Sequence, residues 1–260
     1  MRCEPVLLLS ELTSFGSGIV CLVGGGGKTS LLYALGADIA NTCGSALLTS
    51  TTKMFRPDLT PDFPPQVSVA LEHDPTALPP CRGVVFAARP ASDDGKKVHG
   101  YSADEVDALF SRAIAPTIIV EADGASCRPI KAPATHEPVI PANTTIVIGV
   151  IGLSCFSMPF TPATVFRDEY FAAVTGLTLG DTLTPEAVAA LVLHPKGLFK
   201  NRPRIAKRLL FLNQCDLPGA LDKGAALAEM LFTRDADFLH AVYIGSVNKE
   251  RTSCHKVLSD

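Results

Sequence analysis

Four consecutive glycines stand directly before a lysine and a threonine in the segment CLVGGGGKTS, residues 21–30. Glycine loses more conformational freedom on folding than any other residue, so a run of four indicates a backbone that another group approaches closely. The run follows an apolar stretch at 18–23 that predicts a strand. It precedes a stretch at 29–40 in which leucines and an isoleucine recur at helical spacing. The sequence therefore predicts a strand, a glycine loop and a helix in succession.

A lysine and a threonine that open a helix after a glycine loop are typical of nucleotide-phosphate binding. The N–H groups of the loop and of the helix N-terminus point at the anion, Lys28 reaches the β- and γ-phosphates, and the Thr29 hydroxyl binds Mg²⁺. The pattern G-x-x-G-K-T fits, whereas Leu22 stands where the longer G-x-x-x-x-G-K-[ST] pattern begins with glycine. A glycine turn before a surface lysine is the alternative. The residues expected to contact the nucleotide are Gly24, Gly25, Gly26, Gly27, Lys28, Thr29 and Ser30.

Apolar runs alternate with helical patterns over the rest of the chain. The sequence SADE at 102–105 predicts a capping box at a helix start, and Thr184 followed by Pro185 predicts another start. Strands separated by helices predict an α/β fold, with a mostly parallel sheet and helices on both faces, as in a P-loop NTPase-like three-layer sandwich. We treat residues 1–260 as a single domain. Further strands are predicted at 45–49, 83–87, 117–120, 145–153, 208–212 and 241–244.

The motif EADG follows the apolar strand predicted at 117–120. An acid at the end of such a strand is typical of a carboxylate that holds Mg²⁺ directly or through water. Glu121 and Asp123 would point the same way if the strand continued, because side chains on one face repeat every two residues. We therefore predict catalytic roles for Lys28, Glu121 and Asp123, and Mg²⁺ binding by Thr29, Glu121 and Asp123. Solvated acids at a strand end are the alternative.

The motif NQCD, residues 213–216, resembles the guanine-reading element N-K-x-D of GTPases. In that element the aspartate accepts two hydrogen bonds from the guanine edge, which adenine cannot donate, and the asparagine supports the purine and the loop. Asn213 and Asp216 match the element, whereas Gln214 replaces its lysine. We predict that Asn213 and Asp216 bind the base, with GTP preferred and ATP as the alternative.

Two further polar loops follow predicted strands. In TSTTK, residues 49–53, hydroxyls such as that of Thr52 would sense the γ-phosphate and Lys53 would meet a phosphate or an acidic substrate. A turn rich in serine and threonine is an equally good interpretation. In the proline-rich loop at 121–141, Arg128, Lys131 and His136 indicate an anionic substrate or an acidic partner, with a solvated surface loop as the alternative.

Composition excludes several classes of function. The net charge of −3 argues against a general nucleic-acid or membrane-surface binder. Eight cysteines without a C-x-x-C pair predict free thiols in a reducing compartment, and Cys127 beside Arg128 is a candidate nucleophile. The N-terminal apolar run is too short for a signal peptide or a membrane span, so we expect a cytoplasmic protein.

The motifs VGGGGKTSLL, TSTTKMF, EADG, RPIKAP, HEPVIP, GLS, FRDEYF, HPKGLFKNRP and FLNQCD occur in this order. Together they resemble the YqeC family, whose members are described as accessory proteins in selenium-cofactor biosynthesis or for selenium-dependent molybdenum hydroxylases. The resemblance implies a P-loop at 24–29, an acidic motif at Glu121 and Asp123, and a basic loop with Arg128, Lys131 and His136. The motifs also resemble, more distantly, those of the GTPases that insert nickel. This chain lacks the Cys/His-rich segments of those GTPases, so we expect no nickel or zinc site.

These features predict a Mg²⁺-dependent nucleoside triphosphatase that helps to mature a selenium-dependent molybdenum hydroxylase or its cofactor. An ATP-dependent small-molecule kinase or ligase is the alternative, in which the basic loop would hold an acceptor beside the γ-phosphate. A nucleotide-binding scaffold without turnover is a third possibility.

Overall fold

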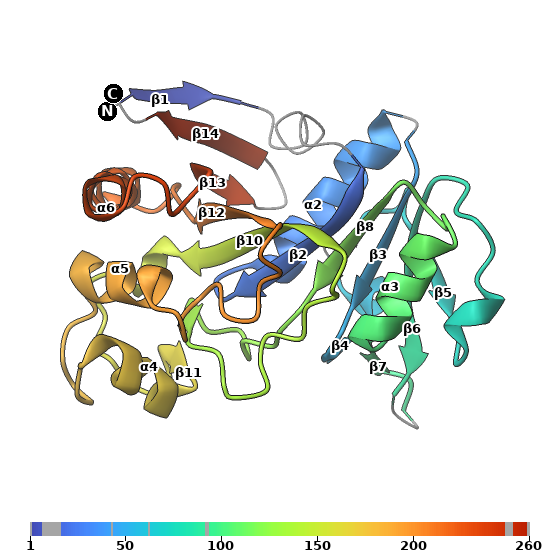
Figure 1. Ribbon diagram of the computed structural model, residues 1–260, viewed down its shortest axis with the longest axis horizontal. Helices are drawn as coiled ribbons and strands as arrows, with labels where there is room; N and C mark the ends of the chain where they lie inside the picture. Colours follow the sequence, from blue (N-terminus) through green and yellow to red (C-terminus); the bar gives the residue numbers. More distant parts are fainter. Residues whose placement is uncertain are drawn as a thin grey trace.

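A computed structural model describes residues 2–6, 17–42, 44–61, 63–91, 94–247 and 252–258. A mixed sheet of 12 strands dominates it, in the order β1-β14-β13-β12-β10-β2-β8-β3-β6-β7-β4, with β5 paired to β6 (Figure 1). Its strands are β1 Arg2–Pro5, β2 Gly18–Gly24, β3 Ala46–Ser50, β4 Lys53–Phe55, β5 Ser68–Leu71, β6 Val84–Pro90, β7 Lys97–His99, β8 Thr117–Glu121, β10 Thr144–Gly152, β12 Lys207–Asn213, β13 Ala241–Val247 and β14 Thr252–Leu258.

The helices lie on both faces of this sheet (Figure 1). A two-stranded parallel sheet of β9 (Ile130–Lys131) and β11 (Val165–Phe166) lies apart from the large one. The helices are α2 Lys28–Asn41, α3 Ala103–Ser111, α4 Asp168–Thr175, α5 Pro185–Leu193 and α6 Ala220–Arg234, with 3₁₀ turns at Pro57–Leu59, Pro75–Ala77 and Leu153–Cys155.

The centre of the sheet is parallel, as the sequence predicts. Strands β13, β12, β10, β2, β8, β3 and β6 run in one direction, and antiparallel strands stand only towards the two edges of the described sheet. Buried strands with helices on both faces are typical of doubly wound α/β folds. The α/β class and the P-loop NTPase-like sandwich are therefore confirmed.

Alternating residues of β2 enter two different hydrophobic cores. Cys21 and Val23 face the core that contains residues of α3, α5 and α6, whereas Val20 and Leu22 face the core that contains residues of α2. Every residue of β2 is buried, as expected for a strand covered on both faces. The strand before the glycine loop is thus held on both sides, which fixes the position of the loop.

The predicted helix starts are present with their capping bonds. Ser102 and Glu105 form the capping box of α3, and the Thr184 side chain accepts a hydrogen bond from the N–H of Ala187 at the start of α5. Helix α3 ends at Ser111. Within the described residues, no helix is long and apolar enough to cross a membrane.

Register brings the polar motifs to one edge of the sheet. Gly24 pairs with Val150, Ser50 pairs with Glu121, and Gly152 pairs with Asn213. Because these strands are parallel, their carboxyl ends meet at the same edge, where ligands bind in such folds. The glycine loop, EADG and NQCD therefore lie close together although they are far apart in the sequence.

Candidate functional site

The glycine loop between β2 and α2 lies close to the backbone of other segments of the protein. A Cβ atom on Gly26 would lie 2.1 Å from the N atom of Gly152, and one on Gly24 would lie 2.4 Å from the carbonyl oxygen of Val150. Gly24 and Gly26 also have φ values of 98° and 78°, a region that favours glycine. These contacts explain the glycine run through packing of the protein itself, a reason that the sequence does not reveal.

Two of the loop N–H groups are bonded to that surrounding backbone. Gly25 donates to the carbonyl oxygen of Val150 and Gly26 to that of Arg128, both at 2.9 Å. Helix α2 begins after Gly27, which has no side chain to cap the first turn. The N–H groups of a first helical turn have no acceptor within the helix. An anion at this loop would therefore be bound mainly by the first turn of α2, which begins with Lys28.

Lys28 is buried in an ion pair with Asp123. Its Nζ lies 3.2 Å from Asp123 Oδ1 and donates to the Gly24 carbonyl oxygen at 2.5 Å. The Asp123 carboxylate also accepts from the Gly24 N–H at 3.1 Å and lies 3.3 Å from Lys131 Nζ. Exposed fractions of 3 % for Lys28, 2 % for Asp123 and 1 % for Lys131 show that these charges are held away from water. The three charges depend on one another, because a buried ion without its partner is strongly destabilising.

Glu121 is placed beside the first turn of α2. Its Oε2 accepts a hydrogen bond of 2.7 Å from the Thr29 hydroxyl. Burial raises the pKa of the Glu121 carboxyl, while Lys28 and the Thr29 hydroxyl act in the opposite direction. The hydroxyl and carboxylate oxygens, 2.7 Å apart, are hard ligands of the kind that Mg²⁺ binds.

The described residues contain no group of three or more His, Cys, Asp or Glu side chains that could hold a metal ion. Thr29 and Glu121 together offer only two protein oxygens. Magnesium commonly keeps several waters and is bound by one or two carboxylates plus substrate phosphates. The pair fits a magnesium ion that arrives with a nucleotide.

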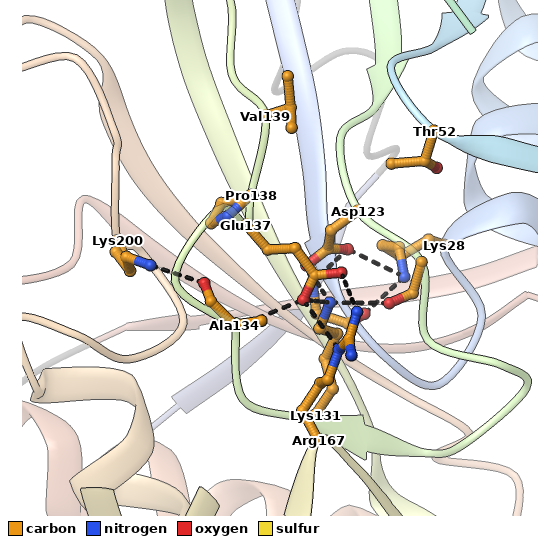
Figure 2. Close-up of polar contacts among 12 residues, drawn as sticks. Lys28, Thr52, Asp123, Lys131, Ala134, Glu137, Pro138, Val139, Arg167 and Lys200 are labelled. Atoms are coloured by element: carbon orange, nitrogen blue, oxygen red, sulfur yellow. Dashed lines mark hydrogen bonds and ion pairs between the residues drawn. The ribbon is translucent and has the colours of Figure 1, made fainter. Parts of the chain in front are cut away.

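Lys131 extends the buried charges beyond Asp123. Its Nζ lies 2.9 Å from Glu137 Oε2 and donates to the Gly124 carbonyl oxygen at 2.7 Å (Figure 2). Glu137 Oε2 in turn lies 3.5 Å from Arg167 Nε. Glu137 lies in the proline-rich loop and in HEPVIP, and Arg167 lies in FRDEYF, but neither of them is assigned a role from the sequence.

The NQCD motif contacts the glycine loop directly. Asn213 Nδ2 donates to the Gly26 carbonyl oxygen at 2.8 Å, and Asn213 Oδ1 accepts from the N–H of Val247 at 3.0 Å. Asp216 is exposed, and its Oδ1 accepts a hydrogen bond of 2.6 Å from the Ser246 hydroxyl. Gln214, in place of the lysine of N-K-x-D, turns towards the protein and accepts from the Ser154 N–H at 3.2 Å.

The remaining predicted residues of the two polar loops lie outside this cluster. Lys53 is exposed on β4, an edge strand of the described sheet, and Figure 2 shows Thr52 apart from the ion pairs, where its N–H bonds the Ser50 hydroxyl. Arg128 donates to the carbonyl oxygens of Ser126 and Pro162, and His136 is exposed.

The cysteines are distributed between the core and the surface. Burial raises the pKa of Cys21 and of Cys155 to about 12, so both remain thiols at neutral pH. Cys127 is exposed, and the guanidinium of its neighbour Arg128 is directed to the two carbonyl groups of Ser126 and Pro162. The six cysteines whose side chains the structure describes form no disulfide.

Fold and site together define an α/β protein in which a glycine loop at the edge of a parallel sheet meets a lysine, two acids and an asparagine. The family described as YqeC protein matches residues 20–169. A relative in Escherichia coli (strain K12), named "Uncharacterized protein YqeC", is 34 % identical over 237 residues, which cover 89 % of this chain and 88 % of that protein. The chain belongs to the YqeC family.

Replacement of Glu121 by glutamine tests the cost of burying this carboxyl. A raised pKa means that the folded state binds a proton more tightly than the unfolded state. The carboxyl therefore lowers the free energy of unfolding as the pH rises above 4.5, the ordinary pKa of a glutamate. Glu121→Gln keeps the acceptor for Thr29, and we expect it to melt at a higher temperature than the wild type at pH 7–8. This advantage should shrink towards pH 4. Equal melting temperatures across this range in a thermal-unfolding series would contradict the assignment.

Proposed function

We propose that this protein binds a purine nucleoside triphosphate together with Mg²⁺ at residues 24–30, hydrolyses it, and acts in the maturation of a selenium-dependent molybdenum hydroxylase or its cofactor. The observation that carries the nucleotide part is the bond between Asn213 and the Gly26 carbonyl oxygen. It joins the candidate base-reading motif to the candidate phosphate loop. The client part rests on the family resemblance of the ordered motifs.

Phosphate binding would use the first turn of α2 and Lys28. The macrodipole of α2 places partial positive charge at its N-terminus, which favours an anion there. The Lys28 ammonium, now shared between Asp123 and the Gly24 carbonyl oxygen, would turn to the β- and γ-phosphates. Asp123 would then keep Lys131 and the Gly24 N–H as partners, so it would not be left as an isolated buried charge.

Thr29 and Glu121 would hold the magnesium ion. When bound, the ion neutralises charge on the phosphates and polarises them towards attack. Glu121 is then ionised, since a nearby dication reverses the effect of burial on a carboxyl. Asp123 lies two residues after Glu121 and is held by Lys28 and Lys131. It would position the attacking water only after Lys28 has moved away.

Base binding would use Asp216 and its support from Ser246. The Ser246 hydroxyl fixes one carboxylate oxygen of Asp216, while the carboxylate remains exposed. A guanine edge presents two donors to such a carboxylate, and adenine presents no matching pair. The protein would therefore prefer GTP, with ATP as the weaker ligand.

A kinase or ligase is the second candidate, and one contact favours it. Lys131 shares the Asp123 carboxylate with Lys28, so a cation of the proline-rich loop lies beside the expected phosphate position. Such a cation would hold an anionic acceptor. Turnover that depends on an added acceptor, rather than on water alone, would distinguish this function from hydrolysis.

Replacement of Lys28 tests the phosphate site. Lys28→Ala removes the ammonium that would meet the phosphate oxygens, and losing one partner of such a charge pair costs about 2–5 kcal/mol of binding. We expect the free energy of nucleotide binding, measured by isothermal titration calorimetry, to become less favourable by that amount. Lys96→Ala, at an exposed lysine of the β6–β7 hairpin, is the matched control. Wild-type affinity in a folded Lys28→Ala protein would refute phosphate binding at this loop.

Replacement of Asp216 tests the choice of base. The wild type should bind GTP about tenfold more tightly than ATP, which is about 1.4 kcal/mol and close to the lower end of the range of about 1.5–3 kcal/mol for a hydrogen bond to a charged group. Asp216→Asn should shift the preference towards xanthosine triphosphate, because xanthine carries a carbonyl where guanine carries its amine. Asp222→Asn, at an exposed aspartate of α6, is the control. If ATP binds the wild type as well as GTP does, NQCD is only a turn after a strand.

A further inference from the structure

Five charged side chains form a continuous line that leads away from the glycine loop. Lys28 lies 3.2 Å from Asp123, Asp123 lies 3.3 Å from Lys131, Lys131 lies 2.9 Å from Glu137, and Glu137 lies 3.5 Å from Arg167. Three cations thus share two carboxylates within this line, and Glu121 interacts with its first member, Lys28. Figure 2 shows Lys131 and Arg167 reaching Glu137 from the same side. The line ends in a cation that is partly open to solvent, since the Arg167 side chain is 33 % exposed.

Arg167 ends this line and is held more loosely than the other members. Its Nε and Nη2 each lie 3.5 Å from a carboxylate oxygen of Glu137, compared with 2.9 Å for Lys131. Within the described part of the chain, the buried Nε has no hydrogen-bond acceptor. An unsatisfied buried donor lowers stability, so Arg167 would gain from a better acceptor.

The backbone of Arg167 supports a functional role. It is the N-cap residue of α4 and has φ 64° and ψ 54°, a left-handed conformation that is uncommon for a residue with a side chain. Strain of this kind persists where the surrounding structure imposes it, and it often accompanies ligand sites. Pairing of β9 with β11 places Lys131 opposite Phe166, the residue before Arg167, and so fixes the two cations relative to each other.

Glu137 shows that the space between Lys131 and Arg167 suits an anion. Its Oε2 accepts hydrogen bonds from Lys131 Nζ and from the N–H of Ala134 at 3.0 Å. Burial alone would raise the pKa of Glu137, yet the Ala134 N–H and the Lys131 ammonium hold that pKa below its usual range. An ammonium, a guanidinium and a backbone N–H form the donor set that binds oxyanions in proteins.

We infer that Lys131 and Arg167 form a second oxyanion subsite beside the glycine loop, which takes a phosphate-type oxyanion in competition with the carboxylate of Glu137. Solvent reaches it at Arg167, whose side chain is 33 % exposed, whereas that of Lys131 is 1 % exposed. The oxyanion is either the terminal phosphate of a bound nucleotide or a phosphate group of a separate substrate. The first source rests on the proposed function, and the subsite itself does not.

Titration of orthophosphate into the nucleotide-free protein tests the subsite, and the dependence of binding on Arg167 and Glu137 distinguishes it from phosphate bound at residues 24–30. We expect saturable binding to the wild type, about tenfold weaker binding to Arg167→Ala, and tighter binding to Glu137→Gln, because the glutamine keeps its size but no longer competes as an anion. Arg82→Ala, at an exposed arginine, should match the wild type. Melting temperatures of all four proteins show whether each variant is folded.

The direction of the Glu137→Gln effect separates a binding role from a structural one. A purely structural ion pair would give weaker or unchanged phosphate binding in both variants. Phosphate binding that is equal in the wild type and Arg167→Ala, or absent from both the wild type and Glu137→Gln, would overturn the inference.

Nucleotide titrations then identify the source of the oxyanion. If it is the terminal phosphate, Arg167→Ala should weaken binding of GTP about tenfold and leave that of GDP unchanged. If it belongs to a separate substrate, Arg167→Ala should leave the affinity for both nucleotides unchanged and weaken phosphate binding to the GDP complex about tenfold. Failure of any nucleotide to bind the wild type would contradict the proposed function, while the phosphate titration would still decide on the subsite.

Discussion

The carboxylate of Asp123 holds two lysines from different segments and the N–H group of Gly24 at the same time. Because all three charges are buried, none can be removed without leaving another without a partner. This contact joins the glycine loop to the proline-rich segment after EADG. It also holds Lys28 against Asp123 and the Gly24 carbonyl oxygen, so in the proposed complex nucleotide binding would exchange one anion partner of Lys28 for another. The energetics of the site therefore depend on Asp123.

The glycine run serves this arrangement through space rather than charge. Residues 128–130 and the end of β10 lie so close to the loop that a Cβ atom on Gly25 or Gly26 would overlap their backbone. The same approach uses the N–H groups of both glycines in hydrogen bonds. The first turn of α2 then remains as the main source of free N–H donors, and Lys28 and Thr29 are its first two residues. A short loop with few free donors is consistent with the shorter G-x-x-G-K-T pattern of the sequence.

The sequence predicted the parallel centre of the sheet and the meeting of the motifs at one edge, because these follow from local periodicity and capping residues. It did not predict helix α6, whose N-cap is Gly219 without a side-chain bond, or the antiparallel pairing of β14 with β1 across the two ends of the chain. The contact between Glu137 and Arg167 was not predicted for a related reason. They meet because β9 pairs with β11, and strands of two residues have no recognisable pattern. Arg128 and His136 were predicted as site residues from their charge alone. In the structure, Arg128 donates to backbone carbonyl oxygens and His136 is exposed, so neither takes part in the buried ion pairs.

Amide hydrogen exchange, measured residue by residue with and without Mg²⁺ and GTP, tests the central claim most directly. Residues 27–30 should become protected, because their N–H groups would bind the phosphates, and Asn213 and Asp216 should respond with them. Gly25 and Gly26 should change little, since their N–H groups are already bonded to backbone carbonyls. Unchanged exchange at 27–30 with saturating nucleotide, or protection confined to another part of the chain, would contradict the account.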